Sequence, residues 1–449
     1  MNMNELIAEQ IRGFDIADYL PIHERMLDLG DLLPPRRGNL VKVVVGMRCS
    51  GKSYRLFQEM LRVHESGVPW DRICYFNFED DRLDPVTPAI GDEVLETFYS
   101  TCPSALEEGA YLFLDELQEM DGWGAWLRRV VDTTKATIYV SGSSSKMLSQ
   151  EISTEFRGRA IDFELLPLSF REYVGAKEPG LSLGPAHSTL ERLSLRRLFD
   201  AYLEEGGFPA ALGLPTAQRV SLLQGYVQRV VVRDVVDRHA LARPRVASVF
   251  ARRVLGTNAK TLSVRRAEGD LRALGLPTSR ALLATLLDYL EQAYLVFRVQ
   301  EFSYALAEGT RKPPKVYAID PGLALANGRA NSNELGQRLE DAVYLELRRR
   351  NVGTRAESVS SFVTRGHGYE VDFVVGDVMF QDALELVQVS VGVEDETTRT
   401  RELRALWEAL EETGLEEATL VVAGGDEASY VQGNRRIRQV PAWKWFLEA

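Results

Sequence analysis

The chain has 449 residues, of which 45% are apolar and 26% are charged, and its formal net charge is −12. This composition is ordinary for a soluble globular protein, and the length predicts about two to four domains. No stretch is long and apolar enough to span a bilayer, and the first ten residues lack the features of a secretion signal, so we expect a cytoplasmic protein with no membrane partner. The three cysteines and five histidines are scattered, which argues against a disulfide framework or a zinc site.

The first chemical motif is the octapeptide GMRCSGKS at residues 46–53, which fits the pattern G-x-x-x-x-G-K-[ST]. The run LVKVVV before it predicts a buried parallel strand, and KSYRLFQEMLRVHESG after it predicts a helix. In this arrangement backbone N–H groups bind phosphates, Lys52 would reach the terminal phosphates of ATP, and Ser53 would hold Mg²⁺. The expected nucleotide contacts are Gly46, Met47, Arg48, Cys49, Ser50, Gly51, Lys52, Ser53 and Tyr54.

A second acidic site is expected where the apolar run YLFL ends in Asp115 and Glu116. Asp115 would hold Mg²⁺ through water, and Glu116 would polarise the water that attacks the γ-phosphate. The later strand ATIYVSGSSS ends in hydroxyl residues, of which Ser141 or Ser143 would contact the γ-phosphate or the attacking water. A plain Ser/Gly turn is the alternative for these serines.

The order of GMRCSGKS, YLFLDELQ, VSGSSSKML, FRGR, ELLPLSFREY and YLEEGGFPAAL resembles that of prokaryotic AAA+ ATPases with a C-terminal domain of unknown function. The resemblance covers nearly the whole chain and implies a homo-oligomer in which Arg157 or Arg159 reaches the neighbouring subunit's nucleotide. A surface arginine pair with acidic neighbours is the alternative. Pro209 resembles the proline of the G-x-P element that packs the lid on the base in related signalling ATPases, which makes it a further candidate nucleotide contact.

Residues 243–332 predict a winged helix, since LSVRRAEGDLRALG and ALLATLLDYLEQ read as two helices and AYLVFRVQEF and PPKVYAID as two strands. Residues 243–319 hold 13 Lys and Arg against 6 Asp and Glu, a charge of +7, so the rest of the chain carries −19. This asymmetry predicts contact with DNA, and pairing with the acidic ATPase domain or a protein partner is the alternative. The candidates for phosphate contacts are Arg265, Arg266, Arg272, Arg280, Arg298, Arg311, Lys312 and Lys315.

From residue 333 the order helix, three strands, helix, strand resembles the PD-(D/E)XK nuclease core. Glu340 and Asp372 match its acidic positions, where carboxylates hold Mg²⁺ beside the scissile phosphate. Gln388 would take the place of the lysine, and Leu386 that of a glutamate, so the resemblance departs from the pattern at both positions. We therefore expect a degenerate nuclease-like domain without efficient cleavage.

The sequence thus predicts an α/β P-loop AAA+ ATPase followed by further domains. The expected parts are an N-terminal helical segment (1–37), the AAA+ P-loop ATPase core (38–174), a helical lid (175–242), a winged helix (243–332) and a nuclease-like α/β domain (333–449). Three functions fit this plan: an Mg-ATP-dependent motor or switch on DNA, a nucleotide-gated protein-interaction ATPase of the signalling kind, and an ATP-regulated nuclease.

Overall fold

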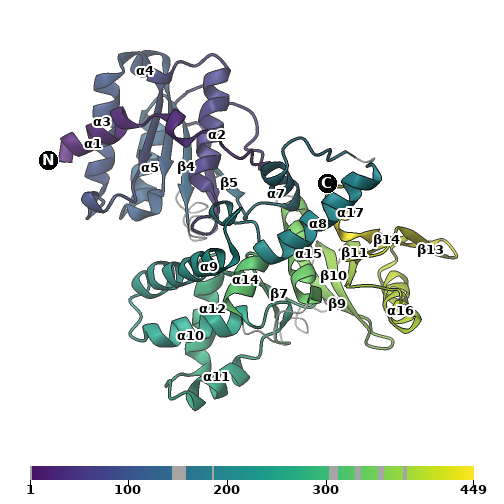
Figure 1. Cartoon of the computed structure of the whole chain (residues 1–449). Coiled ribbons are helices and arrows are strands. Elements are labelled where there is room, and N and C mark those ends of the chain that lie inside the picture. The colour runs from purple at the N-terminus through teal and green to yellow at the C-terminus, as the bar shows by residue number, and fades with distance from the viewer. Residues whose placement is uncertain are drawn as a thin grey trace. The chain divides into compact units, whose positions relative to one another are not determined.

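The computed structural model describes residues 3–143, 158–184, 187–302, 312–328, 335–351, 358–377 and 382–448 (Figure 1). The chain forms two compact units. Unit 1 is Met1–Leu165 with Gln292–Tyr294, and unit 2 is Leu166–Glu291 with Leu295–Ala449. Across the described ranges, no helix combines the length and the apolar character needed to cross a membrane.

Unit 1 is a parallel sheet with helices on both faces (Figure 1). Its elements are α1 (Met3–Gly13), β1 (Val41–Val45), α2 (Lys52–Glu65), β2 (Ile73–Asn77), α3 (Pro88–Thr101), α4 (Pro103–Glu108), β3 (Ala110–Asp115), α5 (Trp123–Thr133), β4 (Ala136–Gly142) and β5 (Ala160–Glu164). Short 3₁₀ helices lie at Ile16–Tyr19, Trp70–Arg72, Asp81–Leu83 and Leu117–Glu119. The expected N-terminal segment is therefore helical only in its first half.

The five strands of unit 1 follow the order β2-β3-β4-β1-β5, and every pair is parallel. Every residue of β1 and β3 is buried, because helices cover both faces of the sheet. α2 packs its apolar stripe, including Leu56 and Met60, against Phe113 and Tyr139 of the sheet. Since all strands run the same way, their carboxyl ends share one edge, which is where ligands bind in such sheets.

The first part of unit 2 is mostly helical. Its elements are α7 (Phe170–Lys177), α8 (Thr189–Glu205), α9 (Thr216–Val230), α10 (Pro244–Leu255), β6 (Lys260–Thr261), α11 (Val264–Ala273), α12 (Arg280–Gln292), β7 (Val296–Val299), β8 (Lys315–Ala318) and α14 (Pro321–Asn327). Ser169 and Ser188 open α7 and α8 with capping boxes, which satisfy backbone donors of the first turn. α9 continues into a π-helical stretch at Val231–Asp237.

The two helices and two strands expected between residues 243 and 332 are present as α11, α12, β7 and β8. Ser279 accepts a hydrogen bond from the Leu282 amide, so this residue caps α12. The strands pair antiparallel in a small sheet of order β6-β8-β7. The two-residue strand β6 is an addition to the predicted pattern.

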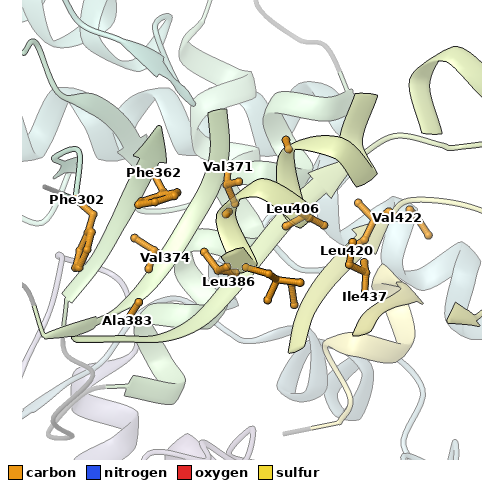
Figure 2. Packing of buried hydrophobic residues seen from close by; sticks show 14 of the residues in the cluster. Phe302, Phe362, Val371, Val374, Ala383, Leu386, Leu406, Leu420, Val422 and Ile437 are labelled. Carbon is orange, nitrogen blue, oxygen red and sulfur yellow. The ribbon is translucent and has the colours of Figure 1, made fainter. Parts of the chain in front are cut away.

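The second part of unit 2 contains a six-stranded mixed sheet of order β13-β14-β12-β11-β10-β9. Its elements are α15 (Leu335–Asn351), β9 (Ser358–Val363), β10 (Glu370–Asp377), β11 (Asp382–Ser390), α16 (Glu396–Thr413), β12 (Glu417–Val422), β13 (Ala428–Gln432), β14 (Arg435–Pro441) and α17 (Ala442–Trp445). Leu386, Leu420 and Leu406 of α16 lie together in the core of this part (Figure 2). Leu386, which stands where the nuclease pattern has a glutamate, is therefore a core residue.

Candidate functional site

The phosphate-binding loop joins β1 to α2 at the carboxyl edge of the unit 1 sheet. A Cβ atom on Gly46 would lie 2.3 Å from the Leu165 carbonyl oxygen, so only glycine fits there. Gly51 has a φ of +100° and forms the N-cap of α2, which begins at Lys52. The first turn of α2 leaves backbone N–H groups without helical partners at this edge, which is the feature that an anion site uses.

Lys52 and Glu116 form a buried ion pair, with 3.0 Å between Nζ and Oε1. The Lys52 ammonium also donates to the Met47 carbonyl at 3.3 Å. Burial alone would raise the pKa of Glu116, but the charges of Lys52 and Arg48 outweigh it and lower the pKa. Glu116 has a φ of +51°, a left-handed conformation that costs a residue with a side chain about 1 kcal/mol. A backbone so constrained turns this carboxylate towards the phosphate loop.

Asp115 is fully buried at the end of β3. The hydroxyls of Ser141 and Tyr75 donate to its two oxygens, the latter at 2.8 Å. Burial and the neighbouring charge of Glu116 raise the pKa of Asp115, while hydrogen bonds from Ser141, Ser53 and Tyr75 act in the opposite direction. The predicted metal residues Ser53 and Asp115 are thus close enough to bond to each other.

The two serines at the end of β4 differ in what they contact. Ser141 orients Asp115 and accepts from the Glu116 amide at 3.0 Å. The Ser143 hydroxyl accepts from the Gln118 amide at 3.2 Å, and the same Gln118 nitrogen donates to Glu116 at 2.5 Å. Ser143 is therefore the serine that faces the carboxylate expected to polarise water.

Arg48 is a second buried cation of this site, and its partners were not expected from the sequence. Its guanidinium lies 2.5 Å from the Glu79 carboxylate and 2.9 Å from that of Glu119. Both acids follow strands that flank each other in the sheet, β2 and β3. The acidic runs FEDD and DELQE directly after two strand patterns are the sequence signal that points to them.

The segment before β1 lies along α2 and contacts the loop. Arg25 donates to the Ser50 carbonyl at 2.8 Å, and the Gln58 amide holds the Arg25 backbone from both sides. Tyr19 and Tyr54 remain partly exposed beside each other, with ring centroids 6.2 Å apart. An aromatic, partly exposed surface thus adjoins the phosphate loop.

The residues present fit a nucleotide with its magnesium ion. The Ser50 hydroxyl is buried in the loop and has no hydrogen-bond partner among the described residues. Such a group is rare in folded proteins and fits a ligand that completes its hydrogen bonding. Asp115 and Ser53 supply the oxygen donors that Mg²⁺ prefers.

Arg159 lies just before β5, and Arg157 lies outside the described residues. The Arg159 guanidinium is half exposed and forms an ion pair with Asp132. Its backbone carbonyl accepts from the amide of Val41, the first residue of β1, so Arg159 lies at the amino edge of the sheet. The phosphate loop leaves from the other edge. Pro209 is half-buried and opens a 3₁₀ helix in unit 2.

A second cluster of charged groups lies in unit 2, where the sequence predicted remnants of a nuclease. Glu340 and Asp372 both face Lys315, at 3.2 and 3.6 Å, and Glu370 contacts the same ammonium at 2.6 Å. The Gln388 side chain accepts from the Asp372 amide at 3.1 Å and donates to Glu402. The structure therefore brings Glu340 and Asp372 together around a lysine, and Gln388 contacts Asp372.

Lys315 is expected from the sequence to contact DNA, but in the structure it is half-buried and contacts these acids. Burial alone would lower the pKa of Lys315, but the charges of Glu340, Asp372 and Glu370 outweigh it and raise the pKa. Burial raises the pKa of both Glu340 and Asp372. In the part of the chain that the structure describes, no group of three or more His, Cys, Asp or Glu side chains is arranged to hold a metal ion.

The predicted DNA contacts fall into two groups. Arg265 and Arg266 are exposed on α11 and have no ion-pair partner among the described residues. The others are paired: Arg272 and Arg280 with Glu268, Arg298 with Asp288 and Glu291, and Lys312 with Glu301. Arg311 lies outside the described residues.

Comparison with known proteins identifies an AAA domain in the part of the chain that holds the phosphate loop. A family described as AAA domain matches residues 38–174, and one described as a domain of unknown function (DUF8612) matches residues 196–334. The Methanocaldococcus jannaschii protein "Uncharacterized protein MJ1544" is 31% identical over 415 residues, which cover 91% of this chain and 88% of that protein. A Haemophilus influenzae protein is 25% identical over 376 residues, covering 84% of this chain and 88% of that protein.

Among solved structures, the Walker-type ATPase PABY2304 of Pyrococcus abyssi matches 67% of this chain and 99% of its own, with 14% identity and a TM-score of 0.43. The identity to MJ1544, which extends along nearly all of both chains, decides the family. The chain therefore belongs to the same family as MJ1544, and it contains an AAA domain followed by a domain of unknown function.

Proposed function

We propose that this chain binds Mg-ATP and hydrolyses it to ADP and phosphate. The observation that carries the proposal is the buried pair of Lys52 and Glu116 beside Asp115, where the phosphate loop meets the end of β3. Bound Mg²⁺, held by Ser53 and Asp115, would draw negative charge from the phosphate oxygens. Tyr19 and Tyr54 would contact the base, since they adjoin the loop.

Hydrolysis would begin when bound ATP replaces Glu116 as the ion-pair partner of Lys52. The ammonium then contacts the terminal phosphates, and the carboxylate is released to accept a proton from water. The water oxygen forms a bond to the γ-phosphorus, the bond from that phosphorus to the β,γ-bridging oxygen breaks, and its electron pair stays on ADP. Gln118 and Ser143 hold Glu116 towards the water.

Two variants separate binding from hydrolysis. Lys52→Ala removes a direct phosphate contact and should lose nucleotide affinity, whereas Glu116→Gln should bind ATP and turn it over at least about a hundredfold more slowly. Binding would be measured with a fluorescent ATP analogue and turnover by phosphate release. Equal loss of binding in both variants would contradict the role of Glu116.

We further propose that the active form is a homo-oligomer in which Arg159, with Arg157 as the alternative, contacts the neighbour's nucleotide. The support is topological, because five residues of β5, roughly 16 Å, separate Arg159 from the edge that carries its own phosphate loop. A mixture of Arg159→Ala and Glu116→Gln, each inactive alone, should regain turnover at mixed interfaces. A protein that stays monomeric with ATP would contradict this assembly.

The charge distribution favours a switch or motor that acts on DNA. In this function the part that contains α11 and α12 would bind the DNA as a winged helix. The exposed Arg265 and Arg266 support it. A nucleotide-gated protein-interaction ATPase is the second candidate, favoured by the ion pairs that already neutralise Arg298 and Lys312. We propose a binding role rather than DNA cleavage for the second part of unit 2, because Lys315 already contacts the acids that would hold a metal ion.

A further inference from the structure

We infer that Arg48, within the phosphate loop, is a catalytic residue that acts on the nucleotide of its own chain, and that Glu79 and Glu119 position it. The inference rests on the proposed ATPase function. It adds a cation that the general loop pattern does not require, since that pattern leaves this position open.

Burial distinguishes Arg48 from a surface ion pair. Its side chain is 9% exposed, whereas those of Glu79 and Glu119 are 34% and 33% exposed. The cation therefore lies inside the site and its two carboxylates lie on the solvent side. Exposed pairs contribute little to stability, but a buried guanidinium held by two acids keeps a fixed place and direction.

A chain of contacts joins Arg48 to the expected base. Arg48 contacts Glu119 at 2.9 Å, Gln118 donates to Glu119 at 3.3 Å, and the same Gln118 nitrogen donates to Glu116 at 2.5 Å. Lys52 thus contacts Glu116 directly, and Arg48 is linked to it through Glu119 and Gln118.

Arg48 would supply charge where the reaction creates it. As the water oxygen bonds to the γ-phosphorus and the bond to the bridging oxygen breaks, negative charge grows on the γ-phosphoryl oxygens and on ADP. The proton of the water passes to Glu116, so Arg48 takes part only as a fixed positive charge. Its guanidinium can contact two oxygens at once, which an ammonium cannot do in the same geometry.

The test compares Arg48→Ala, Arg48→Lys and the control Arg129→Ala in the full chain. Arg129 is an exposed arginine of α5 that pairs with Asp92 of α3, and its loss should leave ATP binding and turnover unchanged. Arg48→Ala should bind ATP within about threefold of the wild type but hydrolyse it about 10²- to 10³-fold more slowly. Arg48→Lys should recover little of the rate, and added guanidinium ion should partly restore Arg48→Ala.

Two further measurements decide between cis action and a structural role. A mixture of Arg48→Ala and Glu116→Gln should regain no turnover, because every site lacks one of two groups that come from the same chain. Glu79→Gln with Glu119→Gln should lower kcat and leave KM nearly unchanged. Recovery in the mixture, or Arg48→Ala turnover within about twofold of the wild type, would overturn the inference.

The inference would also be overturned if Arg48→Ala lost ATP binding while its melting temperature stayed that of the wild type and guanidinium ion gave no rescue. Arg48 would then be a binding residue. Absence of ATP turnover in the wild type would instead overturn the proposed function and this inference with it. The two failures are therefore distinct.

Discussion

Lys315 is surrounded by Glu340, Glu370 and Asp372, so three acids share one ammonium. Replacing the lysine by methionine keeps most of its volume but leaves the acids without a cation. We expect Lys315→Met to lower the free energy of unfolding by about 3–5 kcal/mol at neutral pH, as measured by urea denaturation. Lys312→Met, which removes an exposed pair with Glu301, is the control and should cost less than about 1 kcal/mol. Equal effects would show that Lys315 contributes no more than a surface charge.

The same residue argues against nuclease activity. Hydrolysis of a phosphodiester needs metal ions to polarise the phosphate, and here Lys315 contacts the two acids, Glu340 and Asp372, that would hold one. Leu386 is an apolar core residue at the position where the nuclease pattern has a third acidic ligand, and Gln388 is neutral where the pattern has a lysine. Purified protein with Mg²⁺ or Mn²⁺ should therefore leave DNA intact on a gel. Cleavage that Asp372→Ala abolishes and Lys52→Ala does not would reverse this conclusion.

At this scale, spacing along the sequence explains what could be predicted. Lys52, Asp115 and Glu116 belong to motifs of which one predicts the other, since a phosphate loop requires an acidic site beside it. The structure places the three residues together. The sequence assigns Lys315 to DNA because it shows the positive charge of this residue but not the three acids that surround it in the fold. The alternation of side chains along a strand predicts that Lys315 and Tyr317 lie on the same face. That this face meets α15, where the Tyr317 hydroxyl donates to Glu340, depends on tertiary packing.

Among the elements, helix α14 depends on a buried cap. Asp320 accepts from the Leu323 amide at 2.8 Å and from the Gly207 amide at 2.6 Å, and burial raises its pKa to about 6. The folded protein therefore holds this proton more tightly than the unfolded chain. The resulting stability is fully present below the ordinary aspartate pKa and is lost as the pH rises through about 6.

We expect this loss to amount to about 3 kcal/mol between roughly pH 4 and 6.5, from a pKa difference of about two units. Urea unfolding of the wild type should show it, and Asp320→Asn, whose amide does not titrate, should lack it. Asp395, the exposed cap of α16, has a pKa lowered by hydrogen bonds from Thr398, so Asp395→Asn should keep the wild-type slope in this range. An unchanged slope in Asp320→Asn would show that Asp320 is not the group that titrates.

Elements with a strong local pattern were predictable and the others were not. The helices α11 and α12 and the hairpin of β7 and β8 carry apolar spacing and turn residues of their own. β13 and β14 are not predicted from the sequence, because β13 is exposed or only partly buried along its whole length and β14 begins RRIR, with little apolar alternation. Their pairing with each other and with β12 is what orders them.

For the molecule as a whole, the excess of positive charge in residues 243–319 predicts that this part of the chain binds DNA. Reversing Arg265, Arg266 and Arg280 together to Glu should weaken binding to duplex DNA and flatten the dependence of affinity on salt, because fewer counterions are released. Fluorescence anisotropy at several salt concentrations would measure both. Reversing Arg129, an exposed arginine outside residues 243–319, is the control and should leave the slope unchanged. Absence of binding to any DNA at low salt would favour the protein-interaction function.

The closing contacts of unit 2 join residues far apart in the chain. Phe446 packs its ring against Phe170 of α7 and Phe199 of α8, and Arg350 of α15 donates to the Trp445 carbonyl and covers its ring. During synthesis, the five-stranded sheet of unit 1 has all its strands once β5 has left the ribosome. The core around α8 has to wait for nearly three hundred further residues, since the distance from β5 to Phe446 is that long. Because domains fold in the order in which they emerge, the nucleotide site would form while α7 and α8 still lack their covering residues.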